Sequence, residues 1–184
     1  MPKVSDEHKE ERRRQILEGA RRAFARYGYE RATVVRLEQE IGLSRGAIFS
    51  YFPDKWAIFF ALAEEDYARA GELWIREGFR AVIEQMVLDR PDWLGVYFEL
   101  TSMLRTNPEL RAQWSARNPE IDRRLLEHIV GEQRAGRLRD DLEPAEIARF
   151  LGVILDGVTV HVTAGFPPDL DLVLKLVNAA IRPE

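Results

Sequence analysis

The chain of 184 residues contains no cysteine and only three histidines. Without cysteine it can form no disulfide, and a zinc site would lack its usual thiolate ligands. His8, His128 and His161 lie far apart, and none is followed by a second histidine one helical turn later. We therefore expect neither a metal site nor a cofactor.

Long apolar runs are also missing, because charged residues interrupt every apolar stretch before it reaches the length of a membrane span. The first residues are charged and polar, and they lack the apolar core of a secretory signal. We therefore expect a cytoplasmic protein with no membrane partner.

The sequence has none of the motifs that usually carry catalysis. It contains no phosphate-cradling glycine loop, no nucleophile elbow and no pair of carboxylates at acid–base spacing. The acidic runs Glu64–Asp66 and Asp140–Asp141 are adjacent in sequence, as expected of solvated helix surface and a helix cap. An enzyme is the main competing class, and these absences argue against it.

The formal net charge of −4 is unevenly distributed along the chain. Residues 1–55 carry 12 Lys and Arg against 9 Asp and Glu, whereas residues 56–184 carry 15 against 22. The first segment is therefore basic, as contact with phosphates requires. Alternatively, the arginines at 12–14 and 21–22 form only a solvated helix face with local glutamate partners.

A short amphipathic helix is expected directly after residue 33. Thr33 can cap it, and Val34, Leu37 and Ile41 fall on one face. Gly42 then ends the helix, because glycine tolerates the left-handed backbone of a tight turn.

A second short helix follows this glycine turn. Ser44 is its expected cap, and Ile48 and Phe52 form its buried stripe. Two short helices at this spacing form a helix-turn-helix, whose second helix enters the DNA major groove. We therefore predict that residues 33–52 bind double-stranded DNA.

The same segment resembles the DNA-binding domain of TetR-family transcription factors over about the first 65 residues. The matching residues are Ile16, Leu17, Ala20, Phe24, Gly28, Tyr29, Thr33, Gly42, Ser44, Gly46, Phe52 and Lys55. The resemblance implies contacts with bases or phosphates from Thr33, Ser44, Arg45, Gly46, Ala47, Ser50, Tyr51 and Lys55. Phe49 replaces a tyrosine whose hydroxyl commonly reaches a phosphate, and Tyr51 replaces a common histidine.

Three stretches look closest to the actinobacterial branch of the family that contains aconitase repressors. They are Leu37-Glu38, where Ile-Ala is frequent, the run Arg45–Phe49, and the opening residues 1–5. This resemblance implies a repressor.

Nearly all of the chain has a helical pattern, and we expect an all-α fold of about nine helices. The helix over 6–27 should stop at Gly28, and Asp54 should cap a long helix that begins directly after it. Asn118-Pro119 is expected to start a helix, although Pro119 could instead kink a longer one from Pro108. We assign residues 1–55 to a three-helix DNA-binding head and residues 56–184 to an effector-binding and dimerisation body.

The last two helices, about 145–164 and 169–182, carry more apolar residues than one buried stripe needs. Such surfaces usually mark an interface, and TetR-like proteins form a four-helix dimer bundle from similar helix pairs. Complete burial within the monomer is the alternative. The expected dimer residues are Phe150, Leu151, Ile154, Leu155, Val158, Val173 and Val177.

The middle of the chain is rich in aromatic residues with polar groups between them, which suits a small-molecule site. The resemblance places an inducer there, although plain core packing would also explain these rings. The expected pocket residues are Trp93, Phe98, Met103, Arg105, Trp114 and His161. Arg105 would pair with an acidic group on an otherwise apolar effector, and a small polycarboxylate is the second possibility.

Together these patterns predict a homodimeric, ligand-responsive repressor that binds a pseudo-palindromic operator. The alternative is a helical DNA-binding regulator without an effector, controlled by a protein partner or by its abundance.

Overall fold

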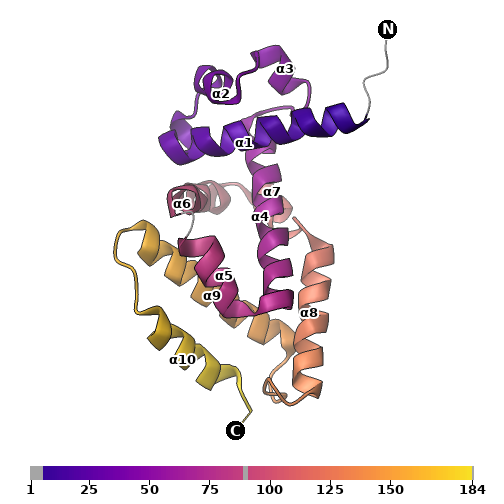
Figure 1. Cartoon of the computed structure of the whole chain (residues 1–184), viewed down its shortest axis with the longest axis vertical. Coiled ribbons are helices and arrows are strands. Elements are labelled where there is room, and N and C mark those ends of the chain that lie inside the picture. The colour runs from indigo at the N-terminus through magenta and orange to yellow at the C-terminus, as the bar shows by residue number, and fades with distance from the viewer. Residues whose placement is uncertain (1–5, 89–90, 184) are drawn as a thin grey trace. The chain divides into compact units, whose positions relative to one another are not determined.

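The computed structural model describes residues 6–88 and 91–183, apart from the side chains of residues 86–88, 91, 92, 94 and 100–102. Within these residues the chain folds into ten α-helices and one π-helical segment, η1 (Figure 1). The expected all-α fold is therefore confirmed. The helix beyond the expected number is α5 (Phe79–Val82), a single turn that leads into η1 (Ile83–Leu88).

The described residues form two compact units that alternate along the chain. Unit 1 comprises the residues up to Asp66 together with Val96–Trp114, and unit 2 comprises Tyr67–Gly95 and the residues from Ser115 onward. The expected boundary after residue 55 therefore differs from the division of the packed units. The physical reason is a set of ring contacts within unit 1, which joins Phe59 to Tyr97, and both Phe60 and Tyr97 to Trp114.

Unit 1 begins with α1 (Asp6–Arg31), which continues past the expected end across a kink at Gly28. The helix-turn-helix consists of α2 (Val34–Ile41) and α3 (Arg45–Phe49), and it packs on α1 around a fully buried apolar core (Figure 1). The large side chains of this core that are fully buried include Ile16, Phe24, Leu37 and Ile48.

The expected caps of the two short helices are confirmed. The Thr33 hydroxyl oxygen accepts a hydrogen bond from the Arg36 amide, and the Ser44 hydroxyl oxygen accepts one from the Ala47 amide. Gly42 between them has a φ of 77°, in the left-handed region that favours glycine. Local sequence chemistry therefore sets the turn between the helices.

The longer helices of unit 1 also begin where polar residues can cap them. Asp54 accepts a hydrogen bond of 2.7 Å from the Ala57 amide at the start of α4 (Lys55–Glu77). Helix α6 (Pro91–Thr106) ends before Asn107, whose side chain caps α7 (Pro108–Ser115).

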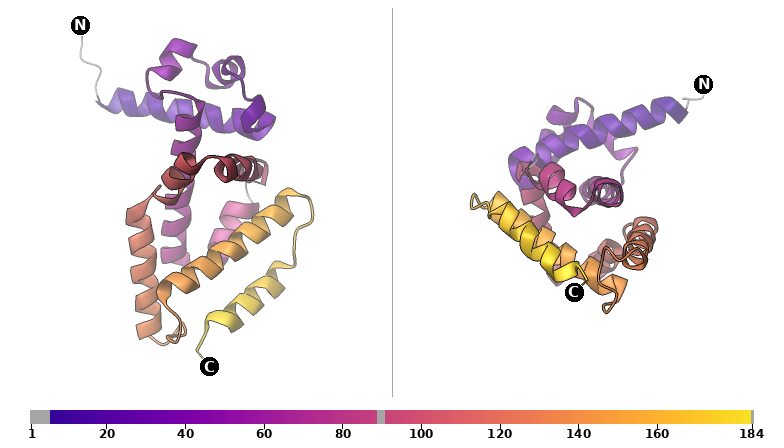
Figure 2. Two further views of the ribbon diagram at one scale, coloured as in Figure 1. Left: turned by 180° about the vertical axis from the view of Figure 1, so that it is seen from behind. Right: turned by 60° about the horizontal axis from the view of Figure 1, so that its bottom comes forward.

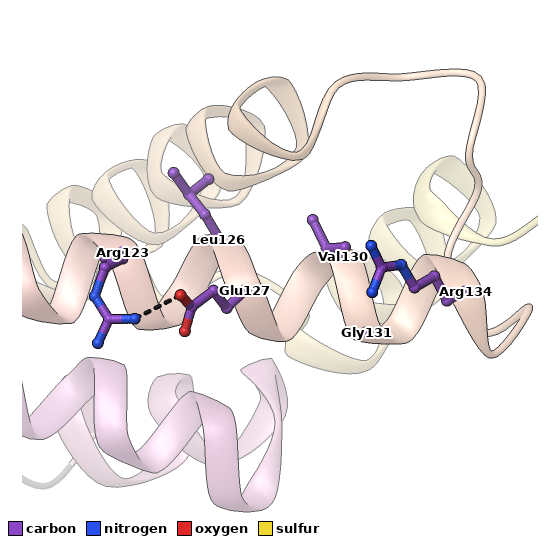
Figure 3. A pocket seen from close by; sticks show the side chains of 6 residues that line it. All are labelled: Arg123, Leu126, Glu127, Val130, Gly131 and Arg134. Carbon is purple, nitrogen blue, oxygen red and sulfur yellow. Dashed lines mark hydrogen bonds and ion pairs between the residues drawn. The ribbon is translucent and has the colours of Figure 1, made fainter.

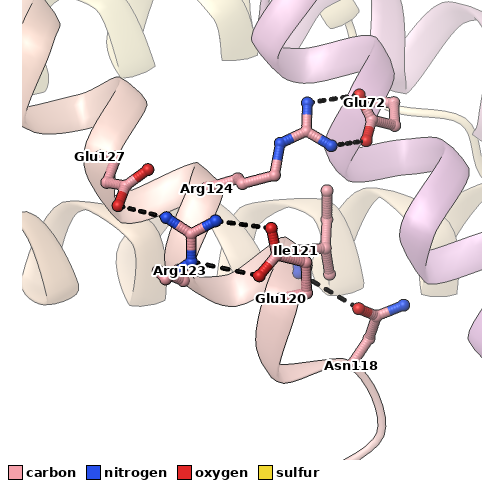
Figure 4. Close-up of polar contacts among 7 residues, drawn as sticks. All are labelled: Glu72, Asn118, Glu120, Ile121, Arg123, Arg124 and Glu127. Carbon is pink, nitrogen blue, oxygen red and sulfur yellow. Dashed lines mark hydrogen bonds and ion pairs between the residues drawn. The ribbon is translucent and has the colours of Figure 1, made fainter.

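In unit 2, α8 (Pro119–Arg134) starts at the expected residue. The Asn118 side chain accepts from the Ile121 amide, and the alternative of a continuous helix kinked at Pro119 is wrong. Arg124 of α8 forms a bidentate ion pair with Glu72 of α4, and Arg123 pairs with Glu120 and Glu127 (Figure 4). The Arg124–Glu72 pair attaches α8 to the second half of α4, whereas the Arg123 pairs lie within α8.

The chain ends in a helical hairpin of α9 (Pro144–Thr163) and α10 (Leu170–Ile181), which lie side by side (Figure 2). Ile147 and Leu151 of α9 pack with Val177 and Ile181 of α10 and with Ile129 of α8. One face of the hairpin therefore belongs to the core of unit 2.

Candidate functional site

The described part of unit 1 contains a surface hollow of about 500 Å³ where the starts of α2, α3 and α4 meet. Three of the residues expected to contact DNA, Thr33, Arg45 and Lys55, line it together. The other lining residues are Glu30, Ala32, Val34, Phe49, Pro53 and Asp54. The structure thus brings a helix cap and two cations from separate elements to one concave surface.

The start of α3 is held by two polar side chains. Besides the Ser44 cap, the Glu38 carboxylate accepts a hydrogen bond of 2.6 Å from the Arg45 amide. In the sequence, Glu38 stands out only as a departure from the family pattern. Its contact fixes the first residue of α3, which is the residue expected to read a base.

Other residues of this segment have side chains that reach solvent. Arg45, Gly46, Ser50 and Tyr51 are exposed, whereas Ala47 is half-buried. The Ser50 hydroxyl already donates a hydrogen bond of 2.7 Å to the Ala47 carbonyl, so its oxygen is the group left to face a donor. The predicted contacts of these residues with DNA stay predictions.

The Lys55 ammonium is bound to the protein as well as lining the hollow. It donates to the Tyr29 carbonyl at 2.8 Å and lies 4.3 Å from the centre of the Tyr29 ring. Burial lowers the pKa of Lys55 below its usual value, although the carboxylates of Glu30 and Glu99 oppose this shift. Burial, together with the nearby Asp54 and Glu30 carboxylates, raises the pKa of Tyr29 to about 12, so this phenol stays protonated.

Two residues that no sequence pattern indicated, Arg36 and Glu99, contact the segment that leads into this hollow. The Arg36 guanidinium lies 4.5 Å from the centre of the Tyr27 ring and donates to the Arg31 carbonyl, next to the segment that leads to Thr33. The second residue is Glu99, whose carboxylate accepts a hydrogen bond from the Tyr29 amide. Glu99 and Tyr29 are 70 positions apart in the sequence, and no local pattern reveals a contact between residues so far apart.

The residues expected to bind an effector do not all belong to one compact unit. Trp93 is buried and His161 is exposed in unit 2, whereas Phe98, Met103, Arg105 and Trp114 belong to unit 1. Arg105 is exposed on α6, so its guanidinium is not part of a buried pocket in this structure. The assignment of these six residues to an effector stays a prediction.

Unit 2 contains a different cation among aromatic and acidic groups. The Arg117 guanidinium lies 3.8 Å from the centre of the Tyr67 ring, and the Tyr67 hydroxyl donates to Asp122. Burial and this hydrogen bond raise the pKa of Tyr67 to about 12. Burial also raises the pKa of Asp156, and the Arg117 charge opposes that shift. No sequence pattern indicated Arg117, because it lies in the bend between α7 and α8.

A hollow of about 410 Å³ lies along α8, and all of its lining residues come from that one helix (Figure 3). They are Arg123, Leu126, Glu127, Val130, Gly131 and Arg134. Because no second element contributes polar groups to this groove, it lacks the convergent arrangement of an effector site.

The residues expected at the dimer interface divide into two groups. Leu151, Val158 and Val177 are buried in the core of unit 2, and Ile154, Leu155 and Val173 are half-buried against it. Only Phe150 of the expected set is exposed. The large apolar side chains on α9 and α10 that are exposed are Phe150, Val153, Val160, Leu172 and Leu176, and Phe166 is exposed in the loop between the two helices.

Two other classes of site were searched for in the described residues. Residues 6–88 and 91–183 contain no group of three or more His, Asp or Glu side chains placed to hold a metal ion. Among the helices of this same part of the chain, none combines the length and apolar character needed to cross a membrane.

Two family models match the chain at successive positions. Residues 16–62 match the model for bacterial regulatory proteins of the tetR family. Residues 75–183 match the model for the C-terminal part of BetI-type transcriptional repressors. The first match covers the helix-turn-helix, and the second runs from the last residues of α4 through α10.

Several curated proteins are similar to the chain over its full length. The HTH-type transcriptional repressor Rv1474c of Mycobacterium tuberculosis is 45% identical, and the match covers 99% of each chain. The HTH-type transcriptional repressor AcnR of Corynebacterium diphtheriae is 43% identical over 99% of this chain and 97% of its own. These similarities confirm the resemblance to the aconitase-repressor branch.

The fold also matches that of solved structures. A transcriptional regulator from Saccharomonospora viridis, solved in complex with choline, superposes with a TM-score of 0.71. The match covers 95% of this chain and 100% of that one, at 24% identity. At this identity the similarity supports the fold alone.

Proposed function

The chain belongs to the TetR family of bacterial regulatory proteins and is a helix-turn-helix transcriptional repressor; from this premise we propose that it binds a pseudo-palindromic operator as a homodimer and is released by an organic acid. The family is not enzymatic, so the expectation of a non-enzymatic protein is confirmed. A cytoplasmic location belongs to the same proposal.

The observation that carries the DNA-binding proposal is the hollow shared by Thr33, Arg45 and Lys55. Arg45 begins α3 and is exposed, so it can place its guanidinium against a guanine in the major groove. Thr33 and Lys55 at the same surface suit contacts with a phosphate. The basic charge of residues 1–55 favours approach to the duplex.

The dimer proposal rests on the outer face of the α9–α10 hairpin. Val153 of α9 is 64% exposed, and Leu176 of α10 is 61% exposed. Large apolar side chains gathered at such exposure favour burial against a second copy. We therefore place the dimer contact on Phe150, Val153, Val160, Leu172 and Leu176, with the half-buried Ile154, Leu155 and Val173 behind them.

Footprinting on the promoter of the host's aconitase gene tests the DNA-binding proposal. We expect protection of two half-sites whose centres are separated by one helical turn of DNA, or a multiple of it, because each subunit supplies one α3. Unrelated promoter DNA of the same length is the control. A single protected half-site, or equal protection of the control DNA, would contradict the proposal.

A thermal-shift series tests the effector proposal. The probes are citrate, as a small polycarboxylate, and decanoate, as an apolar monocarboxylate, with choline as the cationic control. A ligand that binds only the folded state raises the melting temperature, and the rise grows with the logarithm of the ligand concentration once that exceeds the Kd. We expect an acid to stabilise the protein and to release operator DNA.

Two variants then locate the acid. Arg105→Met and Arg117→Met each remove one guanidinium and keep most of the side-chain length. The variant that abolishes the thermal shift identifies the arginine that binds the carboxylate. Absence of any shift with both acids would favour the alternative of a regulator without a small-molecule effector.

A further inference from the structure

The turn that ends the regular part of α1 exposes two backbone amides. Gly28 has a φ of 73° and a ψ of 163°, so the helical hydrogen-bond pattern is interrupted there. The amides of Tyr29 and Glu30 follow this break. Both point to one carboxylate oxygen of Glu99, at 2.8 Å and 3.4 Å.

Glu99 approaches the turn so closely that a side chain at residue 28 would displace its carboxylate. A Cβ on Gly28 would lie 2.5 Å from Glu99 Oε1, closer than real Cβ contacts come. The positive φ of Gly28 would also strain any other residue. The sequence thus provides both the backbone break and the space for the carboxylate.

The carbonyls of the same two residues are bound from another element. Lys55 Nζ, at the start of α4, donates to the Tyr29 carbonyl at 2.8 Å and to the Glu30 carbonyl at 3.4 Å. The two residues are therefore bound by an anion at their amides and by a cation at their carbonyls. Hydrogen bonds to charged groups are stronger than those between neutral groups.

This turn leads directly into the proposed DNA-binding surface. Glu30, Ala32, Thr33 and Lys55 all line the hollow, and Thr33 also caps α2. Any shift of the turn would therefore move the residues expected to reach phosphate, together with the start of the helix-turn-helix.

We propose that Glu99 is a positioning residue for DNA binding, through which helix α6 holds the Tyr29–Thr33 turn in the conformation that binds the operator. The inference rests on the proposed function. Helix α6 contains residues of both compact units, because the division falls between Gly95 and Val96.

When Glu99 is neutralised, a purely electrostatic effect and the loss of a positioning contact predict opposite changes in operator affinity. Removing an acidic charge from a DNA-binding protein should by itself strengthen its affinity for the duplex. Loss of a positioning carboxylate should weaken operator affinity instead. We expect Glu99→Gln to weaken operator binding about tenfold, the scale of a lost charge-assisted hydrogen bond. Glu99→Ala should weaken it at least as much.

Glu109→Gln is the matched control, because Glu109 is exposed on α7 in the same unit and its loss changes the net charge equally. Amide hydrogen exchange provides a second readout that needs no DNA. Exchange at Tyr29 and Glu30 should become faster in both Glu99 variants and stay unchanged in Glu109→Gln.

Operator affinity that is unchanged or stronger in Glu99→Gln would overturn the proposal, and so would an equal loss in Glu109→Gln. Unchanged exchange at Tyr29 and Glu30 would also overturn it, even if Glu99→Ala folds poorly. If the wild-type protein itself protects no symmetric operator, the proposed function fails, which is a distinct result from failure of the Glu99 variants alone.

Discussion

Gly19 of α1 lies against the backbone of Ile41 at the end of α2, so closely that a Cβ on Gly19 would be 2.6 Å from Ile41 Cα. The same contact is secured by side chains of α1 that bind the last carbonyls of α2. Gln15 Nε2 donates to the Ile41 carbonyl at 3.0 Å, and Arg22 donates to the Glu40 carbonyl at 2.7 Å. These bonds satisfy helix-end groups that would otherwise lack partners. Helix α1 therefore sets the position of the helix-turn-helix.

We predict that Gly19→Ala destabilises the protein by about 1–3 kcal/mol, the usual cost of overpacking. Because the clash is with backbone atoms, α2 must move, and operator affinity should fall as well. Urea unfolding and a mobility-shift titration measure the two effects. Gly131→Ala is the control, since nothing lies within 4 Å of its Cβ and alanine should stabilise α8 by about 0.5–1 kcal/mol. Equal stability of the two variants would contradict the prediction.

Arg45→Ala should weaken operator binding by about 1–3 kcal/mol and relax the preference for one base pair in each half-site. The exposed position of Arg45 at the start of α3 is the physical basis of this expectation. Titration against an operator library randomised at each position measures both effects. Arg134→Ala on α8 is the matched loss of an exposed guanidinium. Unchanged sequence preference in Arg45→Ala would show that α3 does not read the operator through this residue.

Lys55→Met removes the ammonium and keeps an apolar stem over the Tyr29 ring. If the ammonium also reaches a phosphate, affinity should fall similarly on operator and random DNA. The slope of log affinity against log salt should then decrease by about one unit. An unchanged slope, with a loss confined to the operator, would instead restrict Lys55 to its contacts with the Tyr29 and Glu30 carbonyls.

Val153→Glu and Leu176→Glu should each convert the dimer to monomers, because an unpaired charge would be buried in the proposed interface. Both side chains are exposed in the single chain, so neither change should disturb its core. Light scattering measures the mass, and operator binding should fall with it. Leu142→Glu, at an exposed residue before α9, is the control. A Val153→Glu protein that remains dimeric would place the interface elsewhere.

The parts of the fold that the sequence predicted correctly depend on local chemistry. Thr33, Ser44, Asp54 and Asn118 cap the helices that begin just after them, because a capping side chain binds amides two or three residues away. The resemblance of the first residues to a family pattern then gave the DNA-binding function.

The parts that were not predicted depend on contacts between distant segments. Glu99 lies in the stretch of aromatic and polar residues in the middle of the chain, and only the packed unit shows its carboxylate at the turn after Gly28. Helix α9 carries more apolar residues than a single buried face needs. Their pattern alone therefore could not distinguish the buried Leu151 and Val158 from the exposed Val153. The alternation of the two units likewise follows from ring contacts between α4, α6 and α7.

The way unit 1 is assembled from two separated stretches bears on how such regulators can recombine. Suppose that residues 1–55 were replaced by the DNA-binding domain of another regulator. The rings of Phe59, Tyr97 and Trp114, which pack as part of unit 1, and the Glu99 carboxylate would then face a domain that did not evolve with them. A hybrid with a foreign head must therefore inherit a compatible α6 and α7, or acquire them by later substitution. Operator specificity in this architecture should therefore change by substitutions on α3, because exchange of the whole DNA-binding domain would disrupt its contacts with α4, α6 and α7.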